Sequence, residues 1–321
     1  MEAASLRPSG TPAGQDPVLA FDRIPVEGMR VRVAHGWPAR GVARGTVVIL
    51  TGRAEFIEKY EETFGDLVGA GFAVAAFDWR GQGGSERFPG PVSGRGHVTR
   101  IEDYLVDFAA VLDHLERLRL PRPWLMLGHS LGGHVGLRHL AADSSRFAGA
   151  VLTAPMFGIN LRPLPRPVAA ALCRLAVGMG AGSRYAPGQR DFDLRRLAYE
   201  RNKLTTCPER FADFQRRVEA MPELAVGGVT YHWLAASLRS IALIHGPGFA
   251  ESVRLPILVC QAGDERLVCN RSIATIARRL PQGRLLTFPE ARHELLRERE
   301  PIRRRFIEAF LSFADEVAAA G

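Results

Sequence analysis

The sequence has little of what marks membrane-spanning, disulfide-bonded or metal-binding proteins. It contains no apolar run of the roughly eighteen residues that a transmembrane helix needs. Its four cysteines form no Cys-X-X-Cys pair and do not cluster with histidine at metal-site spacing; they are Cys173, Cys207, Cys260 and Cys269. We therefore expect reduced thiols, no bound metal and no membrane span.

Lysine is nearly absent, since Lys59 and Lys203 are the only lysines and arginine supplies the rest of the 42 basic residues. The formal net charge is +8, which favours contact with anionic lipid surfaces or nucleic acid. The arginines are scattered and are not interleaved with aromatic residues as in a nucleic-acid groove. We expect no nucleic-acid partner, and peripheral contact with an anionic membrane surface remains an open alternative.

The N-terminal segment, Met1 to Asp16, lacks the apolar core of a signal peptide and is rich in proline, glycine and alanine. We expect a flexible tail over residues 1–17 and a cytoplasmic protein. The whole chain is 46% hydrophobic and 24% charged. That composition is typical of a globular protein with enough apolar residues for a large core.

Beyond the tail, short apolar or β-branched runs alternate with longer segments of helical periodicity. This alternation predicts an α/β fold with a mostly parallel central sheet and helices on both faces. The expected strands are 29–34, 46–50, 72–77, 124–127, 149–153, 255–261 and 284–288. The alternation stops between 157 and 240, where prolines separate helical patterns. We expect residues 157–240 to be a helical cap inserted into a core formed by residues 18–156 and 241–321.

The segment Gly128-His129-Ser130-Leu131-Gly132 lies directly after an expected strand, and a helical pattern begins behind it. A serine hydroxyl is a weak nucleophile and must stand clear of its own backbone to meet a base and a carbonyl. A sharp strand-to-helix turn presents it, and glycines two residues before and after relieve the crowding. The segment predicts Ser130 as a nucleophile; the alternative is an ordinary glycine-rich turn.

A serine nucleophile needs a base, and the base needs an orienting acid. In this architecture the chain order is serine, acid, histidine. His293 follows the last expected strand, and Asp264 and Glu265 follow the strand before it. Because parallel strands end at one edge of the sheet, both loops can reach Ser130. We predict His293 as the general base and leave Asp264 and Glu265 as rival acids, since either carboxylate can hold an imidazole.

A tetrahedral intermediate also needs two N–H donors for its oxyanion. The first is expected from Leu131, at the start of the helix, and the second from Arg53, in the loop after the strand 46–50. A glycine-rich run, Gly81-Gln82-Gly83-Gly84, faintly resembles a dinucleotide-binding loop. Prolines and a glycine follow it where that fold needs a helix, so we expect no cofactor.

Together these motifs resemble the α/β-hydrolase superfamily over nearly all of the chain from about Leu19. Within it, the likeness is strongest to the serine aminopeptidase-like group that holds bacterial lysophospholipases and monoacylglycerol lipases. The segments that carry it are Thr51-Gly52-Arg53-Ala54-Glu55 with Lys59-Tyr60, Asp78-Trp79-Arg80-Gly81-Gln82-Gly83-Gly84-Ser85, Gly128-His129-Ser130-Leu131-Gly132-Gly133, Ala154-Pro155-Met156 and His293-Glu294-Leu295. The family usually has His-Gly where this chain has Thr51-Gly52, which leaves the backbone donor intact.

The resemblance implies a serine hydrolase that cleaves carboxylic esters of lipids through an acyl-enzyme, of the lysophospholipase or monoacylglycerol lipase type. It favours Glu265 as the acid, because the family's acid precedes an arginine and two apolar residues, as in Glu265-Arg266-Leu267-Val268. One alternative is a serine aminopeptidase or proline iminopeptidase-like enzyme. It would need a cap carboxylate for the substrate's amino group, for which the candidates are Glu200, Glu219 and Glu223. Another alternative is a catalytically silent ligand-binding module.

Two further expectations concern the cap. The apolar helical segments 168–177 and 231–244 are expected to line an acyl cavity beside Ser130, with Leu172 and Leu175 among the lining side chains. Arginines of the cap could meet a phosphate headgroup; these are Arg162, Arg166 and Arg174.

Overall fold

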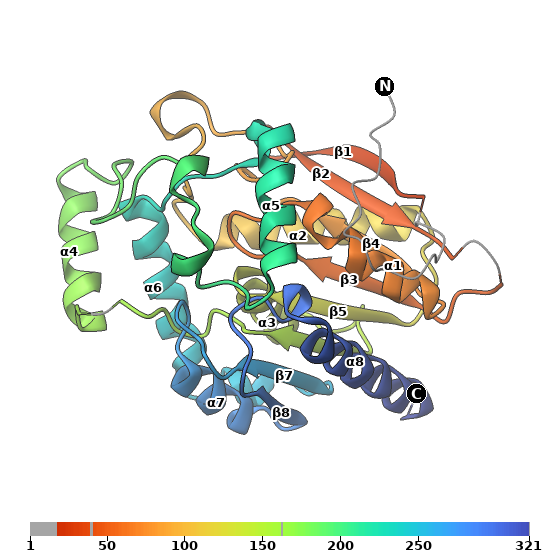
Figure 1. Cartoon of the computed structure of the whole chain (residues 1–321). Helices are drawn as coiled ribbons and strands as arrows, with labels where there is room; N and C mark the ends of the chain where they lie inside the picture. The colour runs from red at the N-terminus through yellow and green to blue at the C-terminus, as the bar shows by residue number, and fades with distance from the viewer. Residues whose placement is uncertain (1–17, 39–40, 162, 321) are drawn as a thin grey trace.

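The computed structural model of the chain describes residues 18–38, 41–161 and 163–320, so the tail expected over residues 1–17 lies outside the described residues. Its centre is an eight-stranded sheet in the order β1-β2-β4-β3-β5-β6-β7-β8 (Figure 1). The β1–β2 and β2–β4 pairs are antiparallel, and all other pairs are parallel. The strands are β1 (Ala20–Val26), β2 (Met29–Gly36), β3 (Thr46–Leu50), β4 (Ala73–Phe77), β5 (Trp124–His129), β6 (Gly149–Thr153), β7 (Ile257–Ala262) and β8 (Gly283–Phe288). The expected mostly parallel α/β sheet is confirmed.

The sequence pattern missed β1, which forms a hairpin with β2 at one edge of the sheet. Most of its side chains are exposed or half-buried, and Pro25 lies near its end. An edge strand needs ladder hydrogen bonds on one side only, so it tolerates a proline and many exposed residues. The alternation of apolar and polar residues that predicts a half-buried strand is therefore weak in β1.

Helices cover both faces of the sheet. On one face, the helices α1 (Glu61–Gly69) and α8 (Glu300–Ala320) pack their phenylalanines against side chains of β3 such as Val47 and Ile49. On the other face, Val48 and Leu50 of the same strand pack with residues of three helices. These helices are α2 (Glu102–Arg117), α3 (Leu131–Ala142) and α7 (Asn270–Arg279). Because β3 is buried on both sides, every one of its side chains is apolar or β-branched.

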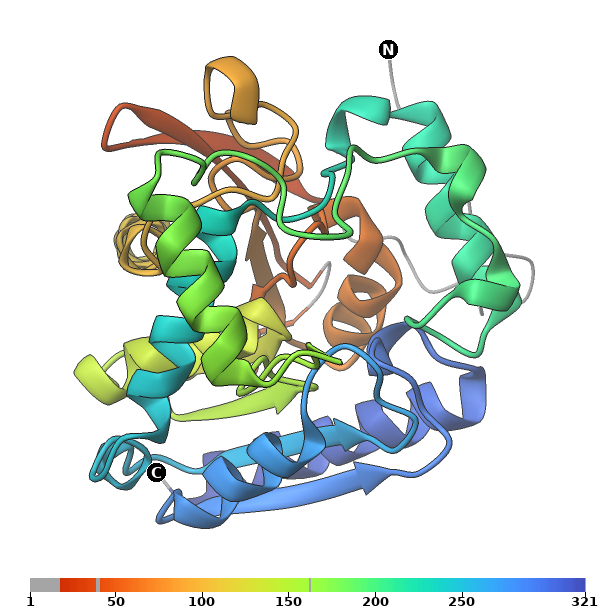
Figure 2. The same cartoon turned by 90° about the vertical axis from the view of Figure 1, so that its left-hand side faces the viewer.

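In the described residues between β6 and β7 there are three α-helices, which we refer to as the cap helices. They are α4 (Arg166–Gly178), α5 (Pro208–Ala220) and α6 (Tyr231–His245). Figure 1 shows α4 and α6 together at the left side of the sheet, and Figure 2, which looks onto that side, shows α5 standing apart from them. Since α6 runs through residue 240, the division of the chain into a core and a cap of residues 157–240 stays a proposal.

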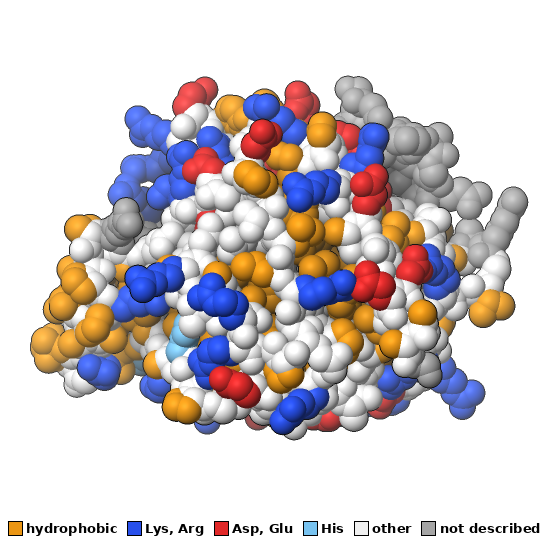
Figure 3. All heavy atoms as spheres, turned by 90° about the horizontal axis from the view of Figure 1, so that it is seen from below, with side chains coloured by type: hydrophobic (Ala, Val, Ile, Leu, Met, Phe, Trp, Pro, Cys, Tyr) orange, Lys and Arg blue, Asp and Glu red, His pale blue; other side chains and the backbone are white. Residues whose placement is uncertain are grey.

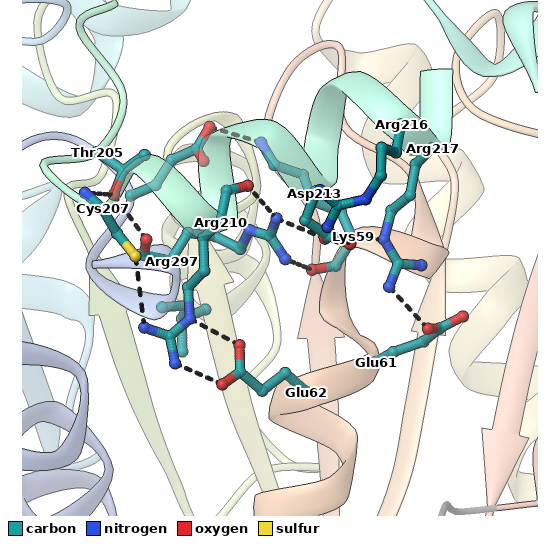
Figure 4. Close-up of polar contacts among 12 residues, drawn as sticks. Lys59, Glu61, Glu62, Thr205, Cys207, Arg210, Asp213, Arg216, Arg217 and Arg297 are labelled. Carbon is teal, nitrogen blue, oxygen red and sulfur yellow. Dashed lines mark hydrogen bonds and ion pairs between the residues drawn. The ribbon is translucent and has the colours of Figure 1, made fainter. Parts of the chain in front are cut away.

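The helix α5 is attached to the core by ion pairs in which the arginine side chains are largely buried (Figure 4). Three of them are Arg210 with Glu62 (2.8 Å), Arg217 with Glu61 (2.9 Å) and Arg297 with Asp213 (2.8 Å). The two glutamates lie on α1, and Arg297 lies in the turn before α8. Asp213 pairs with both Arg217 and Arg297, and removing it would leave the buried charge of Arg297 uncompensated, which is strongly destabilising. These pairs therefore hold α5 against the core.

Candidate active site

Ser130 stands at the turn between β5 and α3, with φ +50° and ψ −110°. Non-glycine residues seldom adopt such a backbone, which costs about 1–3 kcal/mol and persists only where the surroundings enforce it. Here the Ser130 N–H donates to the carbonyl of Thr153 at 3.1 Å, and the Ser130 carbonyl accepts from Met156 at 2.9 Å. A Cβ on Gly132 would lie 2.1 Å from the Leu50 carbonyl oxygen, so only glycine lets α3 approach β3 this closely.

The hydroxyl of Ser130 lies in a continuous chain of hydrogen bonds with His293 and Glu265. Its Oγ donates to Nε2 of His293 at 2.9 Å, and Nδ1 of His293 donates to Oε2 of Glu265 at 2.7 Å. The other carboxylate oxygen, Oε1 of Glu265, accepts the backbone N–H groups of Leu267 at 2.7 Å and Val268 at 3.1 Å. The loops after β5, β7 and β8 thus bring the three side chains together, and the backbone fixes the carboxylate.

Asp264, the rival acid, faces a different set of partners. Its carboxylate accepts from Arg266 at 2.8 Å and from Arg292 at 3.3 Å, and its side chain is 41% exposed. The Glu265 side chain is fully buried. The geometry therefore favours Glu265, one residue further along the loop, as the partner of His293.

The acid and the imidazole shift each other's pKa. Burial alone would lower the pKa of His293, but the charge and hydrogen bond of Glu265 outweigh it, so the pKa is raised above its usual value. Burial would raise the pKa of Glu265, yet the charge of His293 and the hydrogen bonds to its carboxylate lower it. The arrangement thus stabilises an imidazolium paired with an ionised carboxylate.

The loop after β3 lies beside Ser130, because Leu50 of β3 pairs with Gly128 of β5. The N–H of Leu131, at the first position of α3, has no acceptor within its own helix. The N–H of Arg53 donates to no acceptor within the part of the chain that the structure describes. Both predicted oxyanion donors are therefore free to bind a ligand oxygen.

A buried charge cluster, whose role was not predicted from the sequence, supports this loop. Oε2 of Glu55 accepts from the backbone N–H of Gly52 at 2.6 Å and from the hydroxyl of Tyr60 at 2.5 Å. Nζ of Lys59 pairs with Oε1 of Glu55 at 2.9 Å and with Oε1 of Glu294 at 2.5 Å. Burial would raise the pKa of Glu55, but the Lys59 charge more than offsets this and the pKa is lowered. The sequence signals were the spacing of Glu55 and Lys59, four residues apart, and the place of both residues in the segments that carry the family resemblance.

A cavity of about 670 Å³ lies over Ser130 and His293. Its apolar lining comes from the core and from all three cap helices; the lining includes Phe56, Met156, Ile159, Leu161, Leu164, Ala169, Phe192, Leu197, Leu204, Phe214, Val226, Val229, Trp233, Leu234, Leu267 and Val268. The prediction that Leu172 and Leu175 line it was wrong. They are 46% and 59% exposed on the outer side of α4, which contributes only the small Ala169 to the cavity.

Of the charged residues predicted in the cap, those that the structure describes also lie away from the cavity. Glu200, Glu219 and Glu223 are exposed and do not line it. Arg166 donates to Oγ of Ser272 at 3.1 Å, Arg174 is exposed on α4, and Arg162 lies outside the described residues. Among described residues, no group of three histidine, cysteine, aspartate or glutamate side chains is placed to hold a metal ion. Likewise, no described helix combines the length and apolar character that crossing a membrane requires.

Known proteins resemble this chain in sequence and in fold. A lysophospholipase L2 of Escherichia coli strain K12 is 34% identical over 304 residues, which cover 91% of this chain and 84% of that protein. A probable lysophospholipase L2 of Haemophilus influenzae is 27% identical over 91% of this chain and 93% of its own length. A solved monoglyceride lipase of Saccharomyces cerevisiae has a TM-score of 0.75 at 16% identity, covering 95% of this chain and 97% of its own.

The family model described as serine aminopeptidase, S33, matches residues 41–300. The matched range contains the turn at Ser130 between β5 and α3, the loop with Glu265 and the loop with His293. The chain therefore belongs to the serine aminopeptidase S33 family of α/β-hydrolases.

Proposed function

We propose that Ser130, His293 and Glu265 are the catalytic triad of an enzyme that hydrolyses carboxylic esters of lipids, of the lysophospholipase or monoacylglycerol lipase type. The observation that carries the proposal is the unbroken hydrogen-bond chain from Ser130 Oγ (2.9 Å) through His293 to Glu265 (2.7 Å) at an apolar cavity. The names of the relatives, lysophospholipase L2 in two bacteria, support the same substrate class.

In this mechanism, Ser130 Oγ attacks the ester carbonyl carbon while Nε2 of His293 takes the hydroxyl proton. The Glu265 carboxylate stabilises the imidazolium that forms. His293 then gives the proton to the leaving alcohol, and an acyl-serine remains. A water molecule, deprotonated by His293, attacks the acyl-serine and releases the fatty acid. The backbone N–H groups of Arg53 and Leu131 stabilise the oxyanion in both steps, and each such donor contributes about 10²-fold to 10³-fold in kcat.

The residues that line the cavity favour a lipid ester over a peptide as the substrate. An aminopeptidase needs an unpaired carboxylate to hold the substrate's amino group. Of the described residues that line the cavity, the only carboxylates are Glu55 and Glu294, and both pair with Lys59. The remaining lining is mostly apolar and suits an acyl chain. The intact hydrogen-bond chain at Ser130 supports catalysis over a silent ligand-binding module.

We also propose that α4 contacts the membrane surface that supplies the substrate. Its outer side carries large exposed apolar side chains at helical spacing, which we call the α4 stripe: Val168, Leu172 and Leu175 on the helix, and Met179 directly after it. Figure 3 shows hydrophobic side chains gathered at the left, the side on which Figure 1 shows α4, with basic side chains beside them. The sequence from 155 to 190 contains no acidic residue. An apolar stripe beside arginines fits an anionic lipid interface. The predicted cytoplasmic location stays a prediction.

A substrate panel with the purified chain tests the proposed function. It contains monoacylglycerols, lysophospholipids, p-nitrophenyl esters of increasing chain length and aminoacyl amides. Because each buried methylene contributes about 0.8 kcal/mol, we expect kcat/KM for esters to rise roughly threefold to fourfold per methylene until the cavity is full. A flat chain-length profile combined with strong turnover of aminoacyl amides would favour the peptidase instead.

A further inference from the structure

The side chain of Arg53 is positively charged, and neither the proposed triad nor the proposed oxyanion hole uses this charge. It is partly buried and lines the same cavity as Ser130. Its Nη1 donates to the backbone carbonyl of Gly227 at 3.1 Å, and its guanidinium carbon lies 5.9 Å from the centre of the Trp233 ring. Within the described residues, Nε and Nη2 have no acceptor and the guanidinium forms no ion pair.

The other cations of the cavity differ from Arg53. Lys59 lies between Glu55 and Glu294, and Arg266 pairs with Asp264. Lys203 is exposed to water. Burial lowers the pKa of Arg53, against the opposing effects of Tyr104 and Glu55.

Buried charges in proteins are nearly always paired, because an unpaired one loses its hydration without compensation. Glu55 is already balanced by Lys59. A partly buried guanidinium without an ion pair, beside the reacting serine, therefore indicates that an anion is supplied by the ligand.

We propose that the guanidinium of Arg53 binds the phosphate of an acylglycerophosphate substrate and so selects lysophospholipids over neutral monoacylglycerols. This inference rests on the proposed function, since it assumes that Ser130 attacks a lipid ester. The backbone N–H of Arg53 is the proposed oxyanion donor, so the reacting carbonyl lies within one arginine side chain of the guanidinium. In a lysophospholipid, only the glycerol backbone separates the ester from the phosphate.

The chemistry of the two partners matches. A guanidinium presents its N–H groups as a planar fork that binds phosphate oxygens bidentately, and these charge-assisted bonds are shorter and stronger than neutral ones. The hydrogen bond to Gly227 and the Trp233 ring orient the guanidinium before the ligand arrives. A monoacylglycerol would fill the same cavity and leave the cation unpaired, and a site that must leave a buried polar group unpaired discriminates strongly against such a ligand.

The test compares the full-length chain with its Arg53→Gln and Arg53→Lys variants. Both keep the backbone N–H. The substrates are a lysophosphatidylglycerol and a monoacylglycerol with the same palmitoyl chain, each below its micelle concentration. We expect Arg53→Gln to lower the ratio of kcat/KM for the lysophospholipid to that for the monoacylglycerol by about 10-fold to 100-fold. Arg53→Lys keeps the positive charge but loses the planar set of N–H groups, so its ratio should lie between those of the wild type and Arg53→Gln. The control, Arg190→Gln, removes an equal charge from an exposed arginine outside the cavity and should leave the ratio unchanged.

A second arm separates this inference from the proposed function. In a Ser130→Ala background, which cannot form an acyl-enzyme, the dissociation constants of the same two lipids are measured with and without Arg53→Gln. Weaker binding of the lysophospholipid alone supports the inference even if the wild type cleaves neither lipid, a result that would refute the proposed function only. An equal loss for both lipids, in binding or in kcat/KM, would mean that Arg53 only holds the loop at Gly227, and would overturn the inference.

Discussion

His293 makes two hydrogen bonds, and the proposed chemistry depends on both. In one, Nε2 accepts from the hydroxyl of Ser130. In the other, Nδ1 donates to Glu265, which orients the imidazole ring. Because His293 and Glu265 are both buried, neither can exchange its partner for water at low cost. Single substitutions at these positions should therefore affect the rate far more than substitutions at their exposed neighbours.

The two adjacent acids offer a matched comparison. We expect Glu265→Gln to lower kcat by about 10³-fold to 10⁴-fold, because an amide cannot stabilise the imidazolium. Asp264→Asn removes the half-exposed pairs of Asp264 with Arg266 and Arg292, and each such pair contributes at most about 1 kcal/mol. Its activity should stay within about fivefold of wild type. The reverse ranking, measured by kcat on a soluble ester, would assign the role to Asp264.

The raised pKa of His293 predicts the pH dependence of kcat/KM. A general base must be unprotonated, so the rate should fall as the pH drops through the pKa of His293, at a value above the usual 6.5 or so. In Glu265→Gln the largest opposition to the burial of the ring is removed and only the charges of Glu294 and Glu55 still raise the pKa, so the acidic limb should move to lower pH. Profiles of kcat/KM against pH, measured for the wild type and for Glu265→Gln on the same ester, test this prediction. An acidic limb that does not move would show that Glu265 does not act on His293.

The residues of the candidate site differ in how far their roles could be predicted from the sequence. Ser130 and His293 follow from a local motif and from the order of the strands, and Glu265 follows from a four-residue register. The roles of Arg53 and Glu55 depend on contacts with segments far along the chain, at Gly227 and at Glu294 through Lys59. No local pattern encodes such contacts, so only the folded arrangement reveals them.

Among helices and strands, long periodic segments were predicted well and ambiguous ones were not. The strand β1 escaped detection because an edge strand has no continuous apolar pattern. The orientation of α4 was predicted wrongly for a different reason. Its buried residues are the small Ala169, Cys173 and Ala176, and its large apolar side chains point outward. Periodicity identifies two apolar sides in such a helix and does not say which one is buried.

The outward stripe of α4 leads to a membrane-binding prediction. We expect the double variant Leu172→Asp with Leu175→Asp to bind anionic phospholipid vesicles at least about tenfold more weakly, because it removes apolar side chains that would enter the interface and adds negative charge. Hydrolysis of a water-soluble ester should stay nearly unchanged, since neither leucine lines the cavity.

The control for this variant is Leu285→Asp, which makes the same exchange at an exposed leucine of β8, outside α4. Vesicle co-sedimentation at low and high salt is the measurement, and added salt should weaken the binding of the wild type. Equal binding by the double variant and the wild type would show that α4 is not the contact surface.

In the molecule as a whole, the α/β sheet and the family were predicted from the sequence and are confirmed. The reason is physical: alternating strands and helices permit few topologies, and the loops that follow the carboxyl ends of the parallel strands all lie at one edge of the sheet. The cavity was less predictable, because its walls come from α4, α5, α6 and the core at once. Its shape depends on how the cap helices pack, which composition and periodicity do not determine.

The most direct measurement is the release of fatty acid from a lysophospholipid by the wild type and by Ser130→Ala, together with labelling by a fluorophosphonate probe. The wild type should release the fatty acid and carry the probe on Ser130. Ser130→Ala should keep its fold, lose labelling and lose turnover on the order of 10⁶-fold. Full activity in Ser130→Ala, or labelling of another serine in the wild type, would contradict the assignment of Ser130 as the nucleophile of a lipid-ester hydrolase.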